Sequence, residues 1–246
     1  MSSRDAREDW RRFSPGAIPT KESTPQLDAF LAAAAAVTSA AGTPPTLLDV
    51  GCGAGRLSRR IHDRGFSVLG VDISAAAIRA AREQPAAASA GLAFAEADFA
   101  AEAPPRLESG PFDIAVCQLV ISIVGGPRER RNLLTNIRGH LQAGGLLFLS
   151  ASGVSDAINP GYARLYAEDF ASTGERHSYF SRDAAGEILY MTHHFTPEEC
   201  TGLLAEAGFD QIAVETVREA SSRRPDEAAI FLYATCRAAT GATEEP

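Results

Sequence analysis

The sequence predicts an α/β protein built on a doubly wound, mostly parallel sheet of about seven strands. Short apolar runs alternate with helical segments after residue 45, and a glycine-rich turn follows the first run. Runs that are apolar on both faces are typical of parallel strands buried between two layers of helices. We also expect an antiparallel strand near the C-terminus and a lid inserted after the fifth strand.

Local signals place each element. Thr24-Pro25 supplies an N-cap and a proline at the first helical position, which predicts a helix over 26–41. Thr196-Pro197 likewise opens a helix that runs to Ala207. The remaining elements are the strands 46–50, 67–71, 92–97, 112–119, 146–151, 209–217 and 228–236, with helices at 55–64, 74–83 and 127–142. The last two strands have no helix between them, so we expect them to be antiparallel.

The chain divides into three parts by composition. Residues 1–24 form a charged arm, residues 25–238 the main domain, and residues 239–246 a tail. Within the domain, residues 155–195 do not fit the alternation and form a substrate-covering insertion. Its second half, around the turn 183–186, predicts a hairpin.

Composition limits the classes of partner. The net charge is −8, so a broad basic surface for nucleic acid is not expected. No apolar run is long enough to cross a bilayer, and the N-terminus has no signal-peptide core. The four cysteines are widely spaced and form no metal-binding pair. We therefore expect a cytoplasmic protein without a metal or membrane partner, either a monomer or a homodimer.

The first predicted strand runs into the turn Gly51-Cys52-Gly53-Ala54-Gly55, and Asp49 precedes it. A ligand that lies close to the backbone requires residues without a Cβ atom, which explains glycine at alternate positions. The spacing differs from G-x-G-x-x-G, the pattern that cradles a dinucleotide phosphate. The turn therefore favours a ligand without a phosphate at this position.

Carboxylates follow the next two strands. Asp72 lies 17 residues past Gly55, where it can accept hydrogen bonds from both hydroxyls of a ribose. Asp98 follows the third strand, where a carboxylate can bind an adenine amino group and Phe99 can cover the ring. The fourth strand ends at Cys117-Gln118.

Together these residues closely resemble the class I S-adenosylmethionine-dependent methyltransferases, over about residues 44–151. The resemblance implies a Rossmann-like fold, S-adenosyl-L-methionine as cofactor and S-adenosyl-L-homocysteine as product. It implies cofactor contacts from Asp49, Gly51, Cys52, Gly53, Gly55, Asp72, Ile73, Asp98, Phe99, Cys117 and Gln118. For Asp49, a direct contact and a tether that holds the turn both remain open.

The insertion carries the candidates for substrate binding and catalysis. A general base would help if the methyl acceptor is a hydroxyl or a protonated amine, and His193 or His194 is our hypothesis for it. Tyr179 and Tyr190 are candidates for substrate contacts. Strand 209–217 should run parallel to the core strands, so the loop after it should lie on the cofactor side of the sheet. This loop contains Arg223 and Arg224, which are candidates for binding a carboxylate or phosphate of the substrate. Trp10 and Phe13 of the arm are candidates for a further wall.

The expected reaction is direct transfer of a methyl group to an oxygen or nitrogen of a small molecule, and specialised metabolism is a setting that the composition suggests. A nicotinamide-dependent oxidoreductase is the first alternative, but it lacks the expected glycine spacing. The second is a non-catalytic binding protein that retains the fold.

Overall fold

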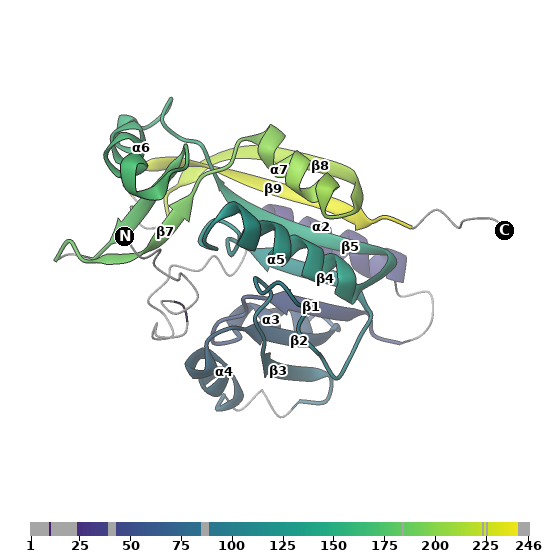
Figure 1. Cartoon of the computed structure of the whole chain (residues 1–246). Helices are drawn as coiled ribbons and strands as arrows, with labels where there is room; N and C mark the ends of the chain where they lie inside the picture. Colours follow the sequence, from purple (N-terminus) through teal and green to yellow (C-terminus); the bar gives the residue numbers. More distant parts are fainter. Residues whose placement is uncertain are drawn as a thin grey trace.

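A seven-stranded sheet forms the centre of the structure, in the order β3-β2-β1-β4-β5-β9-β8 (Figure 1). This computed structural model describes residue 10 and residues 24–38, 43–84, 89–183, 185–222, 224 and 226–240. The strands are β1 (Thr46–Val50), β2 (Ser67–Asp72), β3 (Leu92–Glu96), β4 (Phe112–Gln118), β5 (Leu141–Gly153), β8 (Phe209–Ala220) and β9 (Ala228–Ala238). β1 to β5 pair in parallel, and β9 is antiparallel to both β5 and β8. The expected sheet is confirmed, including the antiparallel C-terminal strand.

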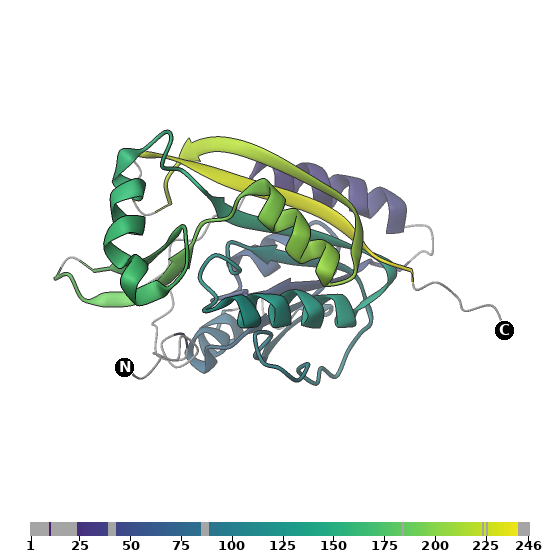
Figure 2. The ribbon, with the colours of Figure 1, turned by 45° about the horizontal axis from the view of Figure 1, so that its top comes forward.

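Helices cover both faces of the sheet. α2 (Pro25–Thr38), α3 (Arg56–His62) and α4 (Ala75–Arg82) bury apolar side chains against one face. α5 (Pro127–His140) and α7 (Pro197–Glu206) bury theirs against the other. Figure 2 shows α5 and α7 together on one side and α2 on the opposite side. Among the described residues, no helix is both long and apolar enough to cross a membrane.

The fifth strand differs from the sequence-based expectation. It begins at Leu141, directly after α5, so the Gly144-Gly145 pair lies inside β5 and does not separate a helix from a strand. Leu141 is already extended, with φ −90° and ψ 142°. The first part of β5 thereby pairs with Phe112 at the start of β4.

The insertion after β5 folds as a helix followed by a hairpin. The hairpin strands β6 (Ser178–Arg182) and β7 (Ile188–His193) are antiparallel, as expected. α6 (Pro160–Thr173) was not anticipated, although Asn159 caps it, Pro160 opens it and Gly174 ends it in the left-handed region. The insertion lies beyond the carboxyl end of β5, at one end of the strands (Figures 1 and 2).

Candidate active site

The glycine turn between β1 and α3 has the backbone that its sequence requires. Gly51, Gly53 and Gly55 have φ values of 78°, 54° and 74°, a region that side chains with a Cβ rarely adopt. A Cβ on Gly51 would lie 2.2 Å from Cγ2 of Val120, whereas a Cβ on Gly53 would meet nothing within 4 Å. The side chain of Val120 therefore packs against the turn at Gly51, whereas the space beside Gly53 is open.

Asp72 connects the end of β2 to this turn. Its carboxylate accepts hydrogen bonds from the Gly53 amide at 2.9 Å and the Ser74 amide at 2.8 Å. Burial raises the pKa of Asp72, and the two amide bonds oppose that shift. Ser74 in turn caps α4 through its hydroxyl. A strand-end carboxylate is thus held by the glycine turn and by the start of the next helix.

Asp49 lies beneath the turn and is almost fully buried. Its carboxylate accepts a hydrogen bond from the hydroxyl of Ser58 on α3, at 2.6 Å. Burial is the largest cause of the rise of its pKa to about 6; the Ser58 bond opposes it, and the charge of Asp72 adds to it. This bond ties the end of β1 to α3, as a tether would, and a direct contact of Asp49 with the cofactor stays a prediction.

The other candidate cofactor residues divide by burial. Asp98 and Gln118 are partly exposed at the carboxyl ends of β3 and β4, as is Ile73 after β2. Phe99 is only 4% exposed and packs in the core with His140 of α5, so its ring is not placed to cover an adenine. Cys117 is fully buried as well. Cys52 is also buried, within the turn.

His194 lies among three tyrosine rings, which together form the tyrosine–histidine cluster (Tyr162, Tyr166, Tyr179 and His194). The Tyr166 hydroxyl is 2.6 Å from Nδ1 of His194, and the rings of Tyr162 and Tyr179 have centroids 4.8 and 5.3 Å away. Burial lowers the pKa of His194 to about 3, with smaller effects from His193, His177 and Arg224. His194 is therefore neutral at physiological pH. Sequence reasoning missed Tyr162 and Tyr166, whose i, i+4 spacing places them on one face of a helix.

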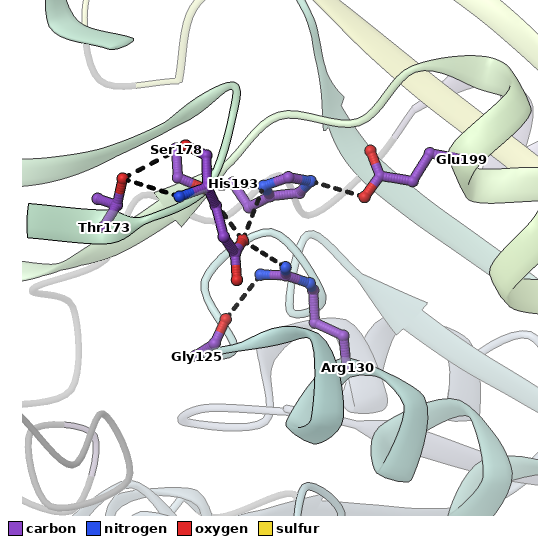
Figure 3. Close-up of polar contacts among 7 residues, drawn as sticks. Gly125, Arg130, Thr173, Ser178, His193 and Glu199 are labelled. Atoms are coloured by element: carbon purple, nitrogen blue, oxygen red, sulfur yellow. Dashed lines mark hydrogen bonds and ion pairs between the residues drawn. The ribbon is translucent and has the colours of Figure 1, made fainter. Parts of the chain in front are cut away.

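His193 has different neighbours, although it is equally buried. Its Nδ1 lies 2.8 Å from the hydroxyl of Ser178, and its Nε2 lies 2.9 Å from Oε1 of Glu199 (Figure 3). Glu175 and Arg130 complete the group, with an ion pair of 2.5 Å between them. The two adjacent histidines thus belong to separate polar environments.

The remaining candidates gather around the insertion. Tyr190 is buried, and its ring packs against that of Trp10 with centroids 4.9 Å apart. The guanidinium of Arg224 lies 5.7 Å from the centre of the Tyr162 ring. The loop after β8 therefore reaches the tyrosine–histidine cluster, as its topology suggested. Arg223 and Phe13 lie outside the described residues.

The strand order, the glycine turn and the strand-end carboxylate define a doubly wound α/β fold of the class I methyltransferase type. Residues 47–145 match the model of a family described as a methyltransferase domain. This match and the strand order support the resemblance to the class I S-adenosylmethionine-dependent methyltransferases that the sequence shows.

Similar proteins support the same class. A ubiquinone biosynthesis O-methyltransferase from Caulobacter vibrioides is 35% identical over 105 residues, covering 43% of this chain and 40% of that protein. The chain thus matches less than half the length of this curated relative. A solved SAM-dependent methyltransferase from Methanosarcina mazei is 28% identical, with a TM-score of 0.69 over 80% of this chain and 93% of the other. The 1,6-didemethyltoxoflavin-N1-methyltransferase of Burkholderia thailandensis is 19% identical, with a TM-score of 0.53 over 85% and 78% of the two chains, and shares the fold.

Proposed function

We propose that this protein is an S-adenosyl-L-methionine-dependent methyltransferase that acts on an oxygen or nitrogen atom of a small molecule. The observation that carries the proposal is the carboxylate of Asp72, which the Gly53 amide holds at the end of β2. Such a carboxylate suits the two hydroxyls of a ribose. The open side of Gly53 fits a ligand that lies against the backbone.

One group of residues would bind the cofactor and another would bind the methyl acceptor. S-adenosyl-L-methionine would supply an activated methyl group on a sulfonium, so the protein contributes mainly proximity and alignment. Asp72 would hold the ribose, Asp98 the adenine edge, and Gly51 to Gly55 the methionine portion. Asp49 and Asp72 would add negative charge near a cationic cofactor.

The methyl acceptor would lie between the carboxyl ends of the parallel strands and the insertion. The tyrosine–histidine cluster, Tyr190 and the Arg223–Arg224 pair are the proposed acceptor contacts. Hydroxyl-bearing compounds are the first class to screen, because curated relatives are named O-methyltransferases. Amines form the second class.

The general-base hypothesis stays with His194. A base must be unprotonated when the acceptor binds, and burial keeps His194 neutral, with a pKa of about 3. So low a pKa makes it a weak proton acceptor in the ligand-free protein, so we expect His194→Gln to lower kcat by about tenfold rather than abolish it. His62→Gln, on α3, is the control, since the His62 ring bonds to the Phe66 carbonyl within its own segment. Equal rates in wild type and His194→Gln would exclude the role.

Calorimetric titration with S-adenosyl-L-methionine and S-adenosyl-L-homocysteine tests the cofactor. We expect binding to weaken by about tenfold to a hundredfold in Asp72→Asn, since hydrogen bonds to a charged group contribute about 1.5–3 kcal/mol. Asp210→Asn, an exposed position on β8, is the matched control and should bind as wild type does. If neither compound bound, the proposal would be contradicted. Binding of a nicotinamide nucleotide instead would support an oxidoreductase. Binding without methyl transfer to any acceptor would favour a non-catalytic protein.

A further inference from the structure

Four charged side chains meet where the insertion touches the core, and the cofactor proposal uses none of their contacts with one another. We call Arg130, Glu175, His193 and Glu199 the buried clasp; they come from α5, the α6–β6 connection, β7 and α7. Figure 3 labels Arg130, His193 and Glu199. The side chains of Arg130 and His193 are 2% and 6% exposed and that of Glu175 is 17% exposed, whereas Glu199, at 36%, lies at the rim of the group. Burial of charge on this scale is costly unless the charges compensate one another.

The hydrogen bonds around His193 can be assigned by counting donors. Glu199 as a carboxylate only accepts, so Nε2 of His193 must carry a proton to form the 2.9 Å contact. The Ser178 hydroxyl has one proton and lies 3.2 Å from Oε2 of Glu175 and 2.8 Å from Nδ1 of His193. When this hydroxyl donates to Glu175, its oxygen accepts from Nδ1, and both ring nitrogens of His193 act as donors.

The neutral alternative leaves the site unbalanced. If Nδ1 carried no proton, Ser178 would donate to it, and Oε2 of Glu175 would keep only its bond from Arg130 at 2.5 Å, with the lone pair of Nδ1 3.4 Å away. The clasp would also hold two carboxylates against one guanidinium. With an imidazolium at His193, two positive and two negative charges compensate. The described residues contain no cluster suited to a metal ion that would balance the charge instead.

The clasp also fastens the loop that follows β4. Arg130 donates to the carbonyl of Gly125 at 2.6 Å, and the His193 amide donates to the carbonyl of Ser122 at 2.7 Å. The Ser122 hydroxyl accepts from the Ser152 amide of β5 at 2.7 Å. Residues 119–126 are therefore bonded to α5, to β5 and to the insertion.

We propose that His193 is held as an imidazolium and acts as a positioning residue, whose charge closes the insertion onto the loop 119–126. The groups that face it are Glu175, Ser178 and Glu199, with Arg130 beside Glu175, and His194 is the next residue, directly after the end of β7. This role excludes His193 as a general base, and it holds whether or not the cofactor proposal is correct.

Nitrogen NMR of the histidine rings at about pH 7.5 tests the charge state directly. We expect one histidine with both ring nitrogens protonated, whose signals disappear in His193→Gln. A single unprotonated ring nitrogen at His193 would overturn the proposal. In Glu199→Gln we expect the Nε2 signal of this ring to shift, because an amide replaces its carboxylate partner, whereas Glu198→Gln, an exposed neighbour, should leave it unchanged.

Hydrogen exchange tests the closure. In Glu175→Gln we expect amide exchange to rise by about tenfold both in 119–126 and in the insertion, because Glu175 joins them through Arg130. Glu168→Gln, on the exposed side of α6, is the control. A rise confined to the insertion would refute the coupling. Neither readout involves methyl transfer, so failure here is distinguishable from failure of the proposed function.

Discussion

Gly51 and Gly53 share a left-handed backbone but face different surroundings. An alanine at either position strains the backbone by about 1–2 kcal/mol. At Gly51 the new methyl would also overlap Val120, so we expect the free energy of unfolding to fall by about 3 kcal/mol in total. At Gly53 the methyl would project into open space, where we propose that the cofactor lies.

We therefore expect the two substitutions to affect different properties, protein stability at Gly51 and cofactor affinity at Gly53. Gly53→Ala should keep most of its stability but bind S-adenosyl-L-homocysteine at least about tenfold more weakly. Gly51→Ala should lose stability first. Denaturant unfolding and calorimetry on both variants measure the two quantities. Wild-type affinity in Gly53→Ala would show that no ligand approaches the backbone at this point.

Asp49 predicts a pH dependence of cofactor binding. Its pKa of about 6 means that the carboxyl gains a proton as pH falls from about 7 to about 5, well above the usual range for aspartate. A cationic sulfonium would then lose a nearby negative charge. We expect affinity for S-adenosyl-L-methionine to fall severalfold over this range, and affinity for S-adenosyl-L-homocysteine, which lacks the sulfonium charge, to fall less.

Ser58→Ala provides the check on this assignment. The Ser58 hydrogen bond lowers the pKa of Asp49, so its removal should shift the transition to higher pH. The same raised pKa makes the ionised form costly in the folded state. Protonation of Asp49 between about pH 6 and pH 4 therefore contributes stability as the pH falls. An unshifted binding profile in Ser58→Ala would assign the pH dependence to another group.

At the level of residues, the sequence identified the turn and Asp72 because their chemistry depends on local spacing. It could not show that Phe99 and Cys117 point into the core, since the side-chain direction at a strand end depends on which helix packs there. It also could not distinguish His193 from His194. Their neighbours Glu199, Arg130 and Tyr166 come from three separate helices.

At the level of elements, an ion pair joins α6 to the hairpin. Asp169 of α6 accepts two hydrogen bonds from Arg182, at 2.9 and 2.6 Å, and a third from the Phe180 amide at 2.8 Å. The Arg182 hydrogen bond is the largest cause that holds the pKa of Asp169 below its usual value. This pair fixes the angle between the helix and β6.

We expect Asp169→Asn to loosen the insertion by about 1–3 kcal/mol of local opening free energy, without unfolding the sheet. Hydrogen exchange over 160–182 measures it. Because the folded pKa is depressed, the same contribution should disappear as the pH falls through it. Equal protection in Asp169→Asn and wild type would show that packing alone holds α6.

The elements of the core followed from alternation of apolar runs and from caps, and most bounds were correct within a few residues. The insertion was harder to predict. Its hairpin has a clear period of two, but α6 carries a weak apolar face and buries mainly tyrosines and Asp169. Such a helix is defined by its caps, Asn159 and Gly174, rather than by its periodicity.

At the level of the whole molecule, the single tryptophan offers a test of cooperativity. Trp10 contacts Tyr190 of the insertion, so its fluorescence reports that region, whereas far-ultraviolet circular dichroism reports the secondary structure of the whole chain. We expect the two unfolding transitions to coincide, because the buried clasp and β5 join the insertion to the core. S-adenosyl-L-homocysteine at about 100 times its Kd should raise the free energy of unfolding that each signal reports by about 2.7 kcal/mol. An earlier transition in fluorescence alone would show that the insertion opens separately.

The overall architecture was predictable because parallel strands and short connections leave few arrangements. The position of β9 between β5 and β8 was not specified by the strand patterns alone. Antiparallel pairing of β9 with β5 extends over Leu146 to Gly153, a contact between segments about 80 residues apart in the chain.

The long strand β5 has a consequence for how this protein could diversify. The proposed cofactor residues all precede it in the sequence, and most of the proposed acceptor contacts follow Gly153, where it ends. Asn159 and Tyr162, just beyond that point, bond to Glu227 and Ser221 in the loop before β9. A recombination event with one crossover in β5 would exchange both segments as a matched set. New acceptor preferences could then be inherited without rebuilding the nucleoside half, and the same junction is a rational place to join the halves of chimeric enzymes.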